Sequence, residues 1–130
     1  MESRTKDAIA RHMRGYNCAQ AVVCTYCDLF GVDEQTAYRL SEGFGLGMGT
    51  QGTCGAMSGA LMLASLKNSG GIENAGATKG STYGIARELT ADFAAQAGST
   101  QCAAIKSPPV IFSCGECIEA ASAWVEKHLL

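Results

Sequence analysis

The apolar positions recur at helical spacing along nearly the whole chain. No alternation with a period of two persists long enough to indicate a sheet. The pattern predicts helices over residues 5–14, 18–30, 34–43, 54–66, 81–97 and 114–130, with a single turn at 102–106. We therefore expect an all-α, single-domain bundle of about five or six helices spanning residues 1–130.

Residues that suit helix starts support these boundaries. Asn17, Asp33 and Ser113 are good N-caps, and Thr53 is the expected cap of the helix over 54–66. That helix is apolar almost all round, so we expect it to be central and buried. A glycine-rich loop, interpreted as a connector or lid over Cys54, precedes it and contains Gly43, Gly45, Gly47, Gly49 and Gly52.

Composition narrows the class of protein. The chain is 47% apolar and 17% charged, as in globular proteins, and its net charge of −2 gives no reason to expect nucleic acid as a partner. The apolar part of 54–66 is shorter than the ~20 residues that cross a membrane. The first residues mix charges and lack an apolar stretch, so we expect no secretory signal and a cytoplasmic location.

The seven cysteines carry the chemical signal. Without an export signal, so many cysteines indicate redox or metal chemistry, and the alternative is that they are small buried apolar residues. Cys54 begins a helix, where unpaired backbone N–H groups and the helix dipole favour thiolate over thiol. It is the hypothesised nucleophile.

Helical geometry sorts the other cysteines. We expect four separate elements to bring Cys18, Cys54, Cys102 and Cys114 together, with Cys117 near. Gly55 and Gly59 would let another backbone approach closely, which disulfide exchange requires. The i,i+3 pair Cys24 and Cys27 lies on roughly the opposite face of its helix from Cys18.

Two alternatives to thiol redox chemistry remain open. The first is a zinc or iron–sulfur carrier, with ligands from Cys18, Cys54, Cys102 and Cys114 or from the two C-x-x-C pairs Cys24/Cys27 and Cys114/Cys117. The second is a structural helical module with cysteines as core filler. The Cys114/Cys117 pair resembles the dithiol of thioredoxins, but the chain lacks the βαβ pattern of that fold.

Other polar residues offer little chemistry. The two histidines, His12 and His128, are expected at the surface or at helix ends. Four acidic residues are interpreted as solvated helix charges: Asp28, Glu42, Glu88 and Asp92. No phosphate-binding loop, nucleophile elbow or HExxH motif is present.

The chain resembles the C-GCAxxG-C-C family of redox-active proteins of bacteria and archaea. The matching pieces are Tyr16 to Val22, Gly43 to Gly49, Cys54-Gly55-Ala56-Met57-Ser58-Gly59, Gly98-Ser99 with Cys102, and the terminal cysteine helix. The resemblance implies a small helical protein with thiol redox activity on an unassigned substrate. Some members resemble selenoproteins, and a transporter system is an implied partner because the genes often lie near transporter genes.

Carried over to this chain, the motif cysteines are Cys18, Cys54, Cys102 and one of Cys114 or Cys117. Cys114 is favoured because Ile118 and Ala121 then follow at the family's spacing, which makes Cys117, Cys24 and Cys27 additions. In our interpretation Cys18, Cys102 or Cys114 resolves a disulfide formed at Cys54, and Cys114 and Cys117 act as a dithiol. The partner would be a redox protein or a small molecule, and the apolar helices are compatible with a homodimer.

Overall fold

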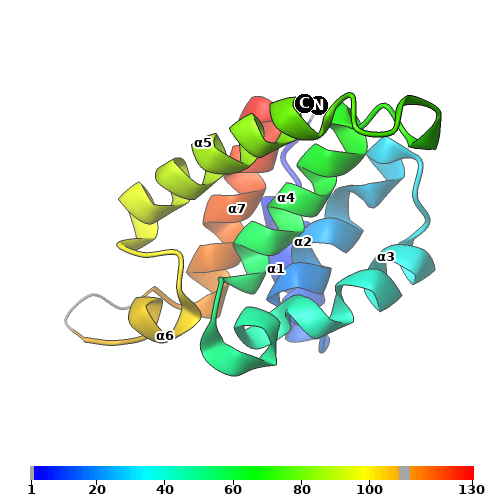
Figure 1. Cartoon of the computed structure of the whole chain (residues 1–130). Helices are drawn as coiled ribbons and strands as arrows, with labels where there is room; N and C mark the ends of the chain where they lie inside the picture. Colours follow the sequence, from blue (N-terminus) through cyan, green and yellow to red (C-terminus); the bar gives the residue numbers. More distant parts are fainter. Residues whose placement is uncertain (1, 109–111) are drawn as a thin grey trace.

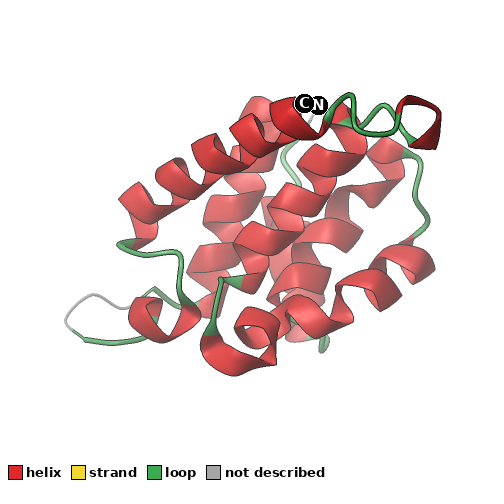
Figure 2. Cartoon of the chain, viewed as in Figure 1, coloured by secondary structure: helices red, strands yellow, loops and turns green. Residues whose placement is uncertain are grey.

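The computed structural model describes residues 2–108 and 112–130, and helices dominate them (Figure 2). Seven α-helices follow in order: α1 (Thr5–Met13), α2 (Cys18–Tyr26), α3 (Glu34–Ser41), α4 (Gly55–Asn68), α5 (Lys79–Ala97), α6 (Cys102–Ile105) and α7 (Cys114–His128). The predicted all-α class is confirmed. The number of helices exceeds five or six because the expected turn at 102–106 closes as the one-turn helix α6.

Helix α4 lies at the centre of the bundle, as its apolar sequence predicted. It packs against α2, α5 and α7 (Figure 1), and Ala60 and Leu63 are completely buried. The seam between α4 and α2 is tight, because a Cβ atom at Gly59 would stand only 2.8 Å from the carbonyl oxygen of Ala19. This close approach places Cys18, the first residue of α2, beside the beginning of α4.

The N-caps agree with the sequence at three helices. Asn17 and Ser113 form capping boxes at the starts of α2 and α7, and the Asp33 side chain accepts a hydrogen bond from the backbone of Thr36. The expected cap of α4 was wrong. Thr53 is held in an isolated antiparallel bridge with Gln101, so the helix begins later and Cys54 occupies the N-cap position.

The glycine-rich loop between α3 and α4 is compact. It contains a 3-10 turn over Glu42–Phe44 and a wide turn over Gly47–Gln51. Three non-glycine residues adopt positive φ angles, Leu46 at 52°, Met48 at 60° and Gln51 at 60°, a region that costs L-residues roughly 1–2 kcal/mol each. The wide turn lies beside α6 (Figure 1).

Short 3-10 turns over Cys27–Phe30 and Ile72–Asn74 complete the helical content. No helix within residues 2–108 and 112–130 has both the length and the apolar character needed to cross a bilayer.

Candidate functional site

A short main-chain pairing joins Cys54 to Cys102 across nearly fifty residues of sequence. The Cys54 N–H donates to the Thr100 carbonyl (2.7 Å), and the Cys102 N–H donates to the Gly52 carbonyl (2.6 Å). Side chains alternate between the two faces of paired strands. Cys54 and Cys102 both neighbour the bridged residues, so their sulfurs leave the pairing on the same side.

A cavity of about 420 Å³ opens where these elements meet. Its walls include the four cysteines expected to converge, Cys18, Cys54, Cys102 and Cys114. The glycine-rich loop contributes Leu46, Gly47 and Gln51 to the same walls, which agrees with the interpretation of that loop as a cover over Cys54.

Cys54 has the environment of a thiolate. A hydrogen bond from the Cys117 thiol lowers the pKa of Cys54 to about 6, and the backbone N–H groups of Met57 and Ala56 and the charge of Lys106 act in the same direction. Burial opposes this shift but is outweighed. The amides at the helix start act in the direction expected from the sequence, but the largest contribution to the shift in the pKa of Cys54 comes from Cys117.

The pKa values of three sulfurs around Cys54 are raised. The pKa of Cys117 is raised because its thiol donates to Cys54 and is completely buried. Burial raises the pKa of Cys18 to about 12, helped by the charge of Cys114 and a hydrogen bond with it. Burial also raises the pKa of Cys102. These shifts favour the thiolate at Cys54 and the protonated thiol at Cys117.

Two cationic or basic side chains that the sequence did not single out line the cavity, Lys106 and His12. The Lys106 ammonium donates to the Phe112 carbonyl (2.9 Å) and to the Cys117 sulfur (3.7 Å). Burial alone would lower the pKa of Lys106, but its interactions with the nearby cysteine side chains, Cys117 first, raise it. His12 donates from Nδ1 to the Tyr16 carbonyl (2.8 Å), since a carbonyl oxygen can only accept.

The other C-x-x-C pair lies in a different place. Cys24 and Cys27 are buried, and their thiols donate to main-chain carbonyls of Glu34 (3.8 Å) and Cys24 (3.6 Å). Burial raises the pKa of both thiols, that of Cys24 to about 12. Neither lines the cavity. We call Cys24 and Cys27 the core pair, and Cys18, Cys54, Cys102, Cys114 and Cys117 the thiol site.

The arrangement of sulfurs bears on the metal-carrier alternative. All seven cysteines lie in the described residues and all are free thiols. Within residues 2–108 and 112–130, no three of their sulfurs lie within 4.8 Å of one another. A metal ion or cluster held by four thiolates would therefore need the cysteine sulfurs to move closer together.

Fold and site together define a small, helical, cysteine-rich protein in which segments distant in sequence bring four cysteines to one cavity. Residues 16–128 match the model of the family described as putative redox-active protein (C_GCAxxG_C_C), and the chain belongs to that family. No curated protein matches the chain, and no solved structure does.

Proposed function

We propose that this protein exchanges thiols with disulfides, with Cys54 as the nucleophile and Cys117 as the first resolving thiol. One observation carries the proposal: at the wall of an open cavity, the pKa of Cys54 falls to about 6 while the Cys117 thiol donates to it. A thiolate is the form of cysteine that attacks disulfides.

The reaction balances with a disulfide R–S–S–R′ as substrate. The Cys54 thiolate attacks one sulfur, forms Cys54–S–S–R and releases R′S⁻. The Cys117 sulfur then attacks the Cys54 sulfur and expels RS⁻, while the Cys117 proton passes to a released thiolate. The Cys54 thiolate and the Cys117 thiol together lose two electrons, and the substrate leaves as one thiol and one thiolate. Reaction with a donor dithiol reverses the sequence and restores the reduced protein.

The remaining sulfurs of the thiol site extend this pathway. Cys114 lies one helical turn before Cys117 at the start of α7, where a C-x-x-C disulfide can form. Cys18 is hydrogen-bonded to Cys114. The disulfide can therefore move from Cys54–Cys117 toward Cys114 and Cys18, with Cys102 as a competing resolving thiol through its main-chain pairing with the Cys54 segment.

The setting of the reaction is also part of the proposal. We place the protein in the cytoplasm, where thiols stay reduced, because all seven cysteines are free. The substrate is a low-molecular-weight disulfide or a redox partner protein, and the cavity of about 420 Å³ has room for the former. The link to a transporter system and a homodimeric state follow only from the family resemblance and the apolar helices.

The decisive experiment follows the reaction of the reduced protein with a chromogenic disulfide as a function of pH. We expect one fast thiol whose rate rises through about pH 6 and then levels, and Cys54→Ser should abolish it. Cys24→Ser is the matched control and should leave the fast phase intact. An apparent pKa at or above the ~8.5 of free cysteine, or a fast phase that survives Cys54→Ser, would refute the proposal.

A further inference from the structure

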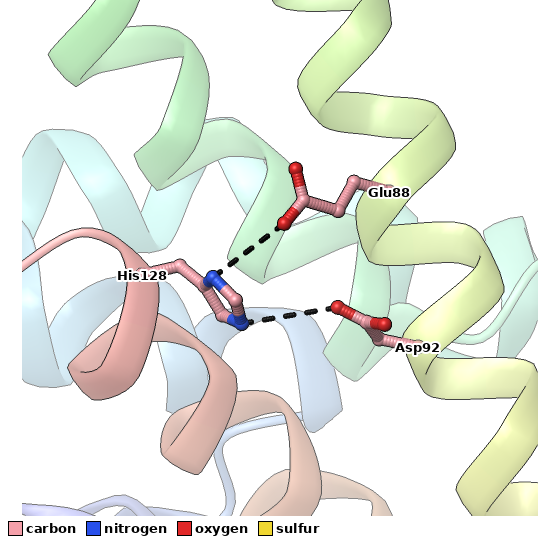
Figure 3. Close-up of side chains that lie close together, drawn as sticks. All are labelled: Glu88, Asp92 and His128. Atoms are coloured by element: carbon pink, nitrogen blue, oxygen red, sulfur yellow. Dashed lines mark ion pairs between the residues drawn. The ribbon is translucent and has the colours of Figure 1, made fainter.

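A second group of ligand-type side chains lies between α5 and α7, outside the thiol site. Glu88 and Asp92 stand one turn apart on α5, and His128 reaches them from the last residue of α7 (Figure 3). His128 Nδ1 lies 3.7 Å from Glu88 Oε1, and its Nε2 lies 3.8 Å from Asp92 Oδ2. The three residues join two helices through one imidazole ring.

These two separations are too long for hydrogen bonds, whose N···O distances are about 2.7–3.2 Å. They involve the two different nitrogens of one imidazole ring, of which a metal ion would bind only one, so at most one of them joins two ligands of the same ion. Two atoms each about 2.0–2.2 Å from a tetrahedral zinc ion lie roughly 3.4 Å apart. One donor atom from each of Glu88, Asp92 and His128 fits within 4.8 Å of the other two, so a small inward shift would complete a three-ligand site.

A neighbouring aromatic residue holds two of the ligands in place. The Trp124 Nε1–H donates to Asp92 Oδ2 (3.1 Å), and the indole stacks on the His128 ring with centroids 4.8 Å apart. Outer contacts of this kind orient metal ligands and fix the ring. Glu88, Asp92 and His128 also line a surface hollow of about 430 Å³, so an ion and its remaining water ligands can enter.

We propose that Glu88, Asp92 and His128 bind one divalent cation of the zinc or manganese type, which connects α5 to the C-terminal turn of α7. One imidazole nitrogen and two carboxylates suit such ions. With His128 neutral, the two carboxylates balance the two positive charges of the ion. The site is independent of the thiol chemistry, because its ligands are oxygen and nitrogen atoms on other residues.

Manganese is the suitable probe because it prefers carboxylate over thiolate, and the chain has only two histidines and one tryptophan as reporters. In NMR spectra of the reduced protein, substoichiometric Mn²⁺ should broaden the His128 ring and the Trp124 indole resonances. His12 lines the thiol cavity and reports any ion bound there, so its signals should stay sharp.

Variants test the ligands directly. His128→Gln and Asp92→Asn should each weaken Mn²⁺ binding by at least about tenfold, whereas Glu119→Gln, which removes a charge from an exposed position on α7, should bind like the wild type. Circular dichroism and an unchanged pH profile of Cys54 would establish that the variants fold. Broadening of His12 with His128 unaffected, or His128→Gln with wild-type affinity, would show that the three residues form an ion pair only.

Discussion

The thiol site and the core pair place cysteines in two different surroundings, and helix α2 carries members of both. Helix α2 begins at Cys18 beside the cavity, whereas Cys24, two turns further on, is enclosed by apolar side chains. Cys24-x-x-Cys27 and Cys114-x-x-Cys117 share a spacing, and each pair lies near a cation, Arg11 for the first and Lys106 for the second. Of the two pairs, only the second donates to a further cysteine whose pKa is lowered. The comparison indicates that backbone N–H groups, the Cys117 donor and the open cavity distinguish the thiol site, while the C-x-x-C spacing and a nearby cation do not.

Removal of the Cys117 thiol should have the largest effect on the difference in pKa between Cys54 and the core pair. Cys117→Ala deletes a hydrogen bond to a charged sulfur, worth about 1.5–3 kcal/mol, and should raise the pKa of Cys54 by about 1–2 units toward the values of the core pair. Cys117→Ser keeps a donor and should restore most of the shift. The pH profile of the fast thiol measures both, and equal profiles for the two variants would contradict the role given to Cys117.

Opening the seam between α2 and α4 should disturb the thiol site. Gly59→Ala places a methyl group 2.8 Å from the Ala19 carbonyl oxygen and should cost about 1–3 kcal/mol of unfolding free energy. Gly84→Ala, on α5 with its nearest neighbour atom 4.0 Å away, should instead stabilise by about 0.5–1 kcal/mol. Urea denaturation compares them, and equal stabilities would show that the seam is loose.

Truncation of a side chain in the core pair should change the free energy of unfolding and leave the reaction of Cys54 unchanged. Cys27→Ala removes a buried sulfur from the core and should cost about 1 kcal/mol. The fast reaction of Cys54 should keep both its rate and its pH midpoint. A shifted midpoint would mean that the core pair is coupled to the thiol site, and the distinction between the two regions would fail.

Neutralising the cation should have the smallest effect. Lys106→Met keeps most of the side-chain volume and should raise the pKa of Cys54 by less than about 1 unit, because charge attraction is a minor cause of the shift and solvent screens it. Lys106→Arg should restore the wild-type value. The same pH profile, repeated at high salt, should narrow the difference between wild type and Lys106→Met.

The sequence predicted the features that depend on local patterns of residues. Period and cap residues located the helices, and helix phase together with the family resemblance indicated which cysteines would converge. The Cys54–Cys117 contact, Lys106 and His12 depend on how α6, α7 and α1 pack, which no local signal encodes. Thr53 failed as a cap for the same reason, since its partner Gln101 lies far along the chain.

The acidic residues of α5 also show that local patterns do not encode tertiary packing. The spacing of Glu88 and Asp92 on one helix face indicates solvated charges. Their proximity to His128 arises from the crossing of α5 and α7, forty residues apart in sequence (Figure 3).

The main-chain pairing at the beginning of α4 has a mechanical consequence. The Cys54 N–H donates to the Thr100 carbonyl and the Cys102 N–H donates to the Gly52 carbonyl, so the backbone of Cys54 is held in place. Because the backbone of Cys54 is held in place, thiol–disulfide exchange at this residue requires the resolving thiols to move toward it. The rate of turnover should therefore depend on the movement of α7, which carries Cys114 and Cys117, and crosslinking this helix to the bundle would slow the cycle without altering the pKa of Cys54.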